Sequence, residues 1–334
     1  MSLISMLHQL MDEIHLYLAV IAVGAFIIWE IWAQLAKHER VPYRAYLWTI
    51  LMFLLAANLS IVKLLNKESS PHQTEDALEQ IASTGRIRIG ISHVAWGPFL
   101  CLGEEKIELT GFDIEVAKQV AEYIGDAVKR RRGGKDIKHN FILFDWIPLL
   151  EAVRDNDVDF AISAITRDNH REQEFNLRFS VPYYETNPSY AMFRNSDDNS
   201  MLAGRKAIYI KDTISRNLAK ETVGNGKVQP EKNWFVAFNS FRLSKSEQPI
   251  IFDDYAFMRY RLTRMNLMKE VNIKRVESRV EEYGIAVNHK QGELLRLINE
   301  SLAQLKQKKE GSLDELKDTW LSDDVPKLCL KELG

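Results

Sequence analysis

Cysteine, metal-ligand clusters and excess charge of one sign are scarce in this sequence. Its 334 residues contain two cysteines, Cys101 and Cys329, far apart and without a Cys-x-x-Cys or Cys/His cluster, so no metal or cofactor site is predicted. The two thiols could stay unpaired or form one long-range disulfide outside the cytosol. The formal net charge is −2, which predicts neither a nucleic-acid-binding surface nor an acidic disordered tail.

Two long uncharged stretches set the amino-terminal part apart from the rest. They read LYLAVIAVGAFII at 16–28 and AYLWTILMFLLAANLSIV at 45–62. With their flanks, each supplies about 20 residues, roughly the 30 Å that a helix needs to cross a bilayer. We therefore predict a membrane anchor over residues 1–66, with transmembrane helices at about 15–36 and 45–65.

The loop between these stretches, KHERVPYR, carries Lys37, Arg40 and Arg44, whereas the first fifteen residues carry no Lys or Arg. The positive-inside rule then places the loop in the cytoplasm and both termini outside. A cleaved signal peptide fits less well, because there is no basic n-region and no small-x-small cleavage site. The prediction is a cytoplasmic-membrane protein whose remaining residues face the cell exterior or the periplasm.

The rest of the chain shows the hydrophobic periodicities of an α/β protein. A polar linker over residues 67–80 comes first, and a second unit with strand and helix patterns begins near residue 188. In the first unit, strand and helix patterns alternate as IRIGISHVA, FDIEVAKQVAEYIG with a predicted end at Gly125, FILFDW, PLLEAVRDND and VDFAISAI. This order predicts a parallel sheet with crossover helices.

Three motifs in the same order carry a resemblance to a known family. They are TGFDIEVAKQVAEYIG, the run from VDFAISAIT through Arg171 to RFSVPYYET, and EYGIAVNHKQGELLRLINESLAQLKQKKEGSLDELKDTWL. Over about residues 84–321 the chain resembles the extracellular solute-binding proteins of family 3, the amino-acid-binding type II periplasmic binding proteins. The resemblance implies a two-lobed α/β fold after the two transmembrane helices. Lobe 1 would comprise 81–187 plus 282–325 and lobe 2 would comprise 188–281, with ligand held between them.

The stretch SAITRDNHR supplies the first candidate binding residues. A guanidinium matches a carboxylate through two parallel charge-assisted hydrogen bonds, which lysine cannot reproduce. The resemblance implies that Arg171, five residues after Thr166, binds the α-carboxylate of a ligand. It also implies that Ser163 and Ala164 contact the ligand's ammonium group through a side chain or a carbonyl.

Further candidates lie elsewhere along the chain. The resemblance places Asp254 where an aspartate pairs with the ammonium group, although Asp253 leaves the register uncertain by one. Strand alternation sends the two side chains to opposite faces, so we expect only one of them in the cleft. Trp96 and Trp146 occupy positions where relatives place aromatic rings against the ligand, with core packing as the alternative.

One segment departs from the family pattern. The sequence reads Lys211-Asp-Thr-Ile-Ser215 where the resemblance predicts Gly-Thr-Thr or Gly-Thr-Ser, so Asp212 adds a negative charge near the expected carboxylate. Thr213 could still bind, with Lys211 offsetting that charge. The predicted ligand is therefore a small molecule with a carboxylate, an amino acid being the first candidate.

The leading hypothesis is a membrane-anchored extracytoplasmic solute-binding protein that closes its two lobes on a ligand and presents it to an ABC transporter permease. The alternative is a ligand-sensing subunit for a signalling partner in the bilayer. A third possibility is a dehydratase-like enzyme on the same fold, with His93 as its acid or base. No catalytic triad spacing is present, so an enzyme is not expected.

Overall fold

A computed structural model of the chain describes residues 76–93, 97–102, 109–132, 136–194, 202–224 and 227–322. These residues all belong to one compact unit that begins at Thr74. The predicted membrane anchor and most of the predicted linker lie outside the described residues. Among the helices within those ranges, none combines the length and the apolar character needed to cross a membrane.

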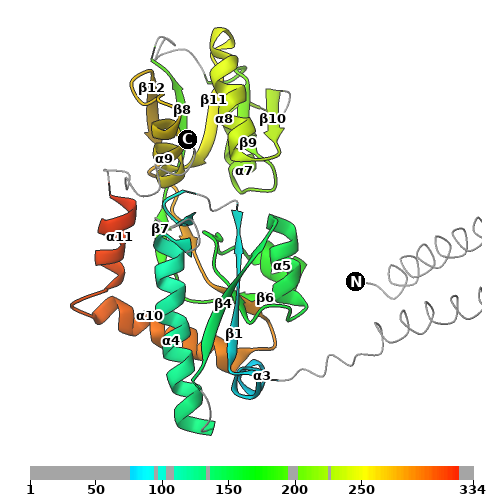
Figure 1. Cartoon of the computed structure of the whole chain (residues 1–334). Coiled ribbons are helices and arrows are strands. Elements are labelled where there is room, and N and C mark those ends of the chain that lie inside the picture. The colour runs from blue at the N-terminus through cyan, green and yellow to red at the C-terminus, as the bar shows by residue number, and fades with distance from the viewer. Residues whose placement is uncertain are drawn as a thin grey trace, which may run out of the picture. The chain divides into compact units, whose positions relative to one another are not determined.

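The first of two five-stranded sheets carries the amino-terminal strands. Its strands are, in spatial order, β4 (Lys138–Phe144), β1 (Arg86–Ser92), β5 (Phe160–Ala161), β14 (Ala286–Asn288) and β6 (Leu177–Phe179). The first three are parallel, as the sequence pattern predicts, whereas β14 runs antiparallel to both of its neighbours. Figure 1 shows α4 and α5 beside β1 and β4.

Both faces of the first sheet are covered, which explains why both residues of its short central strand, β5, are apolar and buried. One face packs on α3 (Ala77–Thr84), α4 (Phe112–Arg132) and α10 (Gly292–Gln307), and the other on α5 (Trp146–Arg154). On the α5 side a Cβ at Gly90 would lie 2.6 Å from a methyl carbon of Leu149. The glycine therefore allows α5 to approach β1 closely.

One helix is longer than its sequence predicts. Gly125 was expected to end the helix that starts at Phe112, yet α4 continues to Arg132. Gly125 has no positive φ there, and a Cβ at this position would meet Ile137 at 3.4 Å. The residues that follow include good helix formers such as lysine and arginine, so the helix continues through the glycine.

The second sheet lies in the part of the chain between residues 188 and 275. Its spatial order is β10 (Val228–Glu231), β9 (Ala207–Ile210), β11 (Ile250–Asp254), β8 (Pro188–Phe193) and β12 (Val271–Arg275). The strands β9, β10 and β11 are parallel, and β8 is antiparallel to both β11 and β12. The sheet packs on α7 (Ser215–Val223) on one face and on α8 (Trp234–Leu243) and α9 (Tyr255–Arg264) on the other.

Two short antiparallel strands connect the sheets. β7 (Tyr184–Thr186) leads from the first sheet into β8, and β13 (Glu281–Tyr283) leads from β12 back to β14. We call β7 and β13 the hinge strands. The chain thus crosses twice between the two sheets, as a two-lobed fold requires, and Figure 1 shows β7 between them.

The remaining elements are short or terminal. They are β2 (Cys101–Leu102), β3 (Leu109–Thr110), α6 (Asn169–Phe175), the 3-10 helix Lys245–Glu247 and α11 (Leu313–Leu321). α11 packs against α4 and α10. Cys101 is buried and disulfide-bonded, and the chain's other cysteine, Cys329, lies outside the described residues.

Candidate functional site

A small enclosed cavity of about 40 Å³ lies where strands of both sheets end. By the usual volume of a buried water, it has room for about three water molecules. Its lining comes from the carboxyl ends of β4, β5, β9 and β11, the place where open α/β sheets usually bind ligands. The lining residues are Trp146, Ser163, Ala164, Thr166, Arg171, Ile210, Thr213, Ile214, Ser215, Asp253, Asp254, Phe257 and Arg261.

This cavity brings together seven of the eight residues predicted to bind ligand. They are Arg171, Thr166, Ser163, Ala164, Trp146, Asp254 and Thr213. Trp96, the eighth, lies outside the described residues. These side chains come from segments up to 108 positions apart, so their meeting is a result of the tertiary fold.

Arg171 is positioned by the loop that precedes it. Its Nη1 donates to the carbonyl oxygen of Thr166 at 3.1 Å, and its backbone N–H donates to Oδ1 of Asp168, the N-cap of α6. The guanidinium carbon lies 5.2 Å from the centre of the Trp146 ring, a cation–π contact. Burial lowers the pKa of Arg171, while nearby carboxylates act in the opposite direction. The guanidinium is therefore held in place beside the cavity.

Ser163 lines the cavity, and its hydroxyl is hydrogen-bonded to the backbone of Ser92. Its hydroxyl donates to the carbonyl oxygen of Ser92 at 3.2 Å and accepts from the N–H of Ser92 at 2.9 Å. The hydroxyl thus fastens the loop after β5 to the end of β1.

Ala164 has a backbone conformation that is rare for alanine. Its φ is 48°, in the left-handed region, and its N–H donates to Oδ2 of Asp113 at 2.6 Å. The other oxygen of Asp113, at the start of α4, accepts from the hydroxyl of Tyr183 at 2.9 Å. The Asp113 carboxyl therefore accepts hydrogen bonds both from Ala164, in the loop after β5, and from Tyr183, the residue that precedes β7.

The Asp113 carboxyl is fully buried. Burial raises its pKa from 3.8 to about 7, and the hydrogen bonds from Tyr183 and Ala164 only partly oppose this rise. The sequence placed Asp113 in a family motif but gave no sign of this contact with Ala164.

Asp253 and Asp254 both line the cavity, so the expectation that alternation would leave only one of them there is wrong. Both residues lie in β11, which ends at Asp254 directly before α9 begins at Tyr255, and the cavity at this strand end is lined by both side chains. Asp253 forms a buried ion pair with Arg261, whose guanidinium also lies 4.5 Å from the Phe257 ring. Asp253 is therefore neutralised within the protein.

Asp254 is placed differently from its neighbour. Oδ2 accepts a hydrogen bond from the hydroxyl of Tyr283, and Oδ1 is buried without a hydrogen bond from any residue that the structure describes. Burial raises the pKa of Asp254 well above its usual range, and the carboxylates of Glu281 and Asp253 add to the rise. Its free oxygen makes Asp254 the acidic residue of the cavity that a cationic group could contact.

Sequence reasoning missed Glu281 on the hinge strand β13. Thr166 Oγ1 donates to its Oε2 at 3.5 Å, and burial raises the pKa of Glu281 while the nearby Arg171 opposes the rise. In the sequence, Glu281 and Glu282 look like an exposed acidic pair. Only the fold shows that these two residues lie on a strand between the two lobes, with their side chains on opposite faces of that strand.

The backbone conformation of Asp212 explains in part why an aspartate can replace the glycine of the family pattern. It has a φ of 64°, the left-handed conformation that glycine adopts without strain and that aspartate tolerates. Its side chain is exposed, so water screens the extra charge. The hydroxyl of Thr213 donates to the carbonyl oxygen of Ile210 at 2.6 Å.

A larger and more open cavity of about 750 Å³ adjoins the enclosed one. The two share Trp146, Arg171, Thr213 and Ile214 in their linings. Both acidic and basic side chains line the larger cavity, among them Asp168, Glu174, Lys211, Asp212 and Arg216. A ligand held at Arg171 could extend a polar side chain into this space.

The residues considered for catalysis lie apart from this arrangement. His93 is 46% exposed in its side chain and lies 3.3 Å from Asp145, and it lines neither cavity. Within the described ranges, no group of three or more His, Cys, Asp and Glu side chains is arranged to hold a metal ion.

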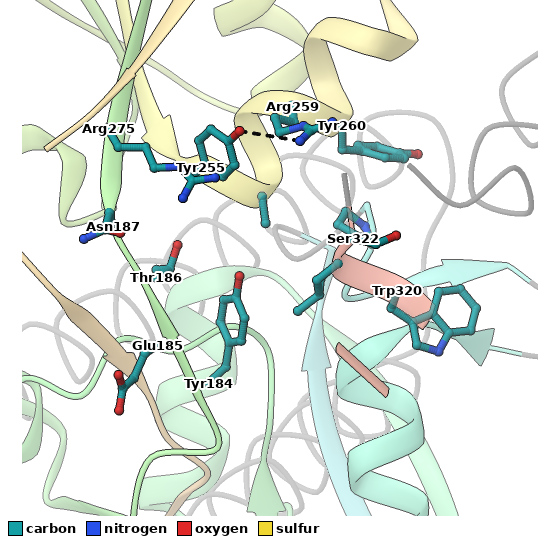
Figure 2. Close-up of a pocket in the computed structure, with 13 residues that line it drawn as sticks. Tyr184, Glu185, Thr186, Asn187, Tyr255, Arg259, Tyr260, Arg275, Trp320 and Ser322 are labelled. Carbon is teal, nitrogen blue, oxygen red and sulfur yellow. Dashed lines mark hydrogen bonds between the residues drawn. The ribbon is translucent and has the colours of Figure 1, made fainter. Parts of the chain in front are cut away.

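A third cavity, of about 160 Å³, lies beside the hinge strand β7 and shares no lining residue with the other two (Figure 2). Figure 2 shows Arg275 and Arg259 on either side of Tyr255. Their guanidinium carbons lie 3.5 Å and 5.7 Å from the centre of that ring. Burial alone would raise the pKa of Tyr255, but the hydrogen bonds from the two arginines lower it. This cavity is thus basic and is separate from the cleft.

Comparisons with known proteins agree with the fold. The family of bacterial extracellular solute-binding proteins, family 3, matches residues 87–323. The ABC transporter glutamine-binding protein GlnH of Bacillus subtilis (strain 168) is 27% identical over 263 residues, which cover 78% of this chain and 89% of that protein.

Two solved structures are also similar. An ancestral arginine-binding protein bound to arginine has a TM-score of 0.58 at 25% identity, covering 71% of this chain and 99% of that one. A substrate-binding protein of an ABC uptake transporter from Streptococcus pneumoniae, with bound histidine, has a TM-score of 0.61 at 17% identity, covering 76% of this chain and 99% of that one. At this identity the second match supports the fold alone.

Proposed function

Because the chain belongs to the bacterial extracellular solute-binding proteins of family 3, we propose that it binds an α-amino acid between its two lobes. The observation that carries the proposal is that Arg171 and Asp254 face the same enclosed cavity. Arg171 supplies a planar cation for a carboxylate, and the free oxygen of Asp254 supplies an acceptor for an ammonium group. An α-amino acid carries both of these groups.

The volume of the cavity also supports a proposal for how a ligand enters it. About 40 Å³ is too little for a whole amino acid, so ligand would enter while the lobes are apart and would be enclosed as the hinge strands bend. Its side chain would pass Trp146 into the adjoining cavity. The glutamine-binding and arginine-binding relatives named above support an amino acid with a polar side chain.

We further propose that the residues before 76 tether this module to the outer face of the cytoplasmic membrane and that an ABC permease receives the ligand. The similarity to the ABC transporter glutamine-binding protein GlnH supports this partner. Copurification of the full chain with a permease tests it, and recovery with a signalling receptor instead would contradict the transport role.

The binding proposal is tested by thermal unfolding of the full chain with L-glutamine, L-arginine and L-histidine. A ligand present at about 100 times its dissociation constant should stabilise the protein by about 2.7 kcal/mol. Arg171→Ala should weaken binding by about 10–100-fold, since a hydrogen bond to a charged group contributes about 1.5–3 kcal/mol.

Arg167→Ala is the matched control, because Arg167 lies four residues away and pairs with Glu282 outside the cavity lining. This variant should bind like the wild type. If no amino acid shifts the melting temperature, or if Arg171→Ala keeps the full shift, the proposed function is wrong.

A further inference from the structure

The cavity of about 160 Å³ beside β7, which we call the hinge cavity, has walls from three parts of the fold (Figure 2). Residues 184–186 of β7 form one wall, and the end of α11 with Ser322 forms another. The third wall is the amino end of α9 together with Arg275 of β12, and both of these elements belong to the second sheet or pack on it. The hinge cavity has about four times the volume of the enclosed cavity, which is enough for a small molecule.

Arg275 is held over the face of an aromatic ring at the edge of this cavity. Its guanidinium carbon lies 3.5 Å from the centre of the Tyr255 ring. A contact through the face of the guanidinium leaves N–H groups at its edge for an acceptor. Within the part of the chain that the structure describes, Arg275 forms no ion pair with a carboxylate. An anion from solution can therefore approach those N–H groups.

A second arginine lies on the other side of the same ring. The guanidinium carbon of Arg259 is 5.7 Å from the ring centre, and its Nη1 donates to the Tyr255 hydroxyl at 3.5 Å. Figure 2 shows the two arginines on either side of Tyr255. Two cations around one ring repel each other, and an anion beside them lowers that cost. The amino end of α9, a helix of ten residues, adds partial positive charge at the same wall.

The acidic residue of the described lining, Glu185, does not neutralise the two arginines. Its side chain is exposed, and Figure 2 shows it pointing away from Tyr255. The hydroxyl groups of Tyr184 and Thr186 point toward Tyr255 instead. A hydroxyl can donate a hydrogen bond to an anion, so the side of the cavity near the arginines offers several donors.

We propose that the hinge cavity binds a small oxyanion, a phosphate or a short dicarboxylate, through Arg275 and Arg259. A guanidinium binds either anion through paired, charge-assisted N–H···O bonds. The hydroxyls of Tyr184 and Thr186 donate to the remaining oxygen atoms. This site shares no lining residue with the proposed amino-acid cavity, so it stands or falls independently of the proposed function.

An anion in this position connects the second sheet to the hinge. Arg259 and Arg275 lie on α9 and β12, whereas Tyr184 and Thr186 lie on the hinge strand β7. The structure contains the hinge cavity together with the enclosed form of the amino-acid cavity, so a bound anion favours this arrangement. By linkage, the anion then raises the affinity for an amino acid, and the amino acid raises the affinity for the anion by the same factor.

The test is isothermal titration of the full chain with sodium phosphate and with sodium succinate at neutral pH and constant ionic strength. We expect one saturable site per chain for at least one of the two anions, and the anion that binds identifies the chemical group. Arg275→Gln should weaken this binding by about 10–100-fold, because it removes a charged hydrogen-bond donor. If neither anion gives saturable binding to the wild type, the proposal is overturned.

Lys274→Gln is the matched control. Lys274 precedes Arg275 on β12, carries the same charge, is exposed and does not line the cavity. This variant should bind the anion like the wild type, and an equal loss in both variants would mean only general electrostatic attraction. If Arg275→Gln does not fold, Tyr255→Leu replaces it, since the ring that orients both arginines is then lost; unchanged binding would overturn the site.

The chain's own carboxylates provide a competing occupant. Asp323 and Asp324 follow Ser322 in the sequence. The double variant Asp323→Asn, Asp324→Asn should bind the anion like the wild type. If a free anion binds to this variant alone, the arginines serve the chain's own carboxylates, and the proposal is wrong.

The coupling between the two cavities is measured by titrating L-glutamine, L-arginine and L-histidine with and without a saturating concentration of the anion. Whichever amino acid binds should bind about fivefold or more tightly in the presence of the anion. Equal affinities would refute the coupling. If none of the three amino acids binds, the proposed function fails, and the phosphate and succinate titrations still decide the anion site.

Discussion

The buried carboxyl of Asp113 allows a quantitative prediction about stability. In the folded protein its pKa is about 7, whereas 3.8 is the ordinary value that we expect in the unfolded chain. Between these values the folded state keeps a proton that the unfolded state has lost, so stability falls as pH rises from about 4 to about 7. At about 1.36 kcal/mol per pKa unit, the loss amounts to about 4 kcal/mol.

The perturbation is Asp113→Asn, which keeps the shape of the side chain and cannot ionise. Urea denaturation at about pH 4, 5, 6, 7 and 8 gives the free energy of unfolding of the variant and the wild type. The variant should gain about 4 kcal/mol relative to the wild type between the lowest and the highest pH. Asp126→Asn on the exposed face of α4 is the control and should follow the wild type.

Two parallel pH profiles for Asp113→Asn and the wild type would refute the reasoning. They would mean that Asp113 is charged in the folded protein throughout this range. The hydrogen bonds from Ala164 and Tyr183 would then outweigh the cost of burial, contrary to the raised pKa.

Three further predictions concern stability. Arg261→Met should lower the free energy of unfolding by about 3–5 kcal/mol, because Asp253 would stay buried without its partner; Asp253→Leu in the same chain should recover most of that loss in urea denaturation. Gly111→Ala should cost more than about 2 kcal/mol by the same assay, since φ is 121° and the added Cβ would lie 2.5 Å from the Phe99 carbonyl oxygen; a loss below about 0.5 kcal/mol would contradict this. Asp212→Gly should increase the free energy of unfolding by up to about 1 kcal/mol and so raise the melting temperature slightly, because glycine adopts the φ of 64° without strain. A lower melting temperature would count against this.

Local patterns were enough to predict most of the elements that position the site. The apolar alternation of RIRIGIS predicts β1, and the helical spacing from Phe112 predicts α4. The end of α4 was predicted wrongly at Gly125, because a glycine lowers helix stability by only about 1 kcal/mol and neighbouring contacts can offset it. The proposed lobe boundaries and the membrane helices stay predictions.

The candidate site was also predicted from the sequence only in part. Arg171 lies in the first turn of α6, five residues after Thr166, so their proximity follows from their spacing, and both line the cavity. The presence of both Asp253 and Asp254 in the cavity lining was missed, because a cavity at the end of a strand can be lined by residues from both of its faces. A pattern with a period of two cannot show where its own strand ends.

The sequence by itself determined the alternation of strands and helices, the spacing of Thr166 and Arg171, and the family to which the chain belongs. Only the tertiary structure decided which polar and charged groups contact each other. Asp113 and Ala164 are 51 positions apart, and Thr166 and Glu281 are 115 positions apart. Periodicity in the sequence predicts which face of a helix or strand is buried. The pKa of a buried group depends instead on burial beside a particular partner, and the way the two lobes fold around the hinge strands determines that partner.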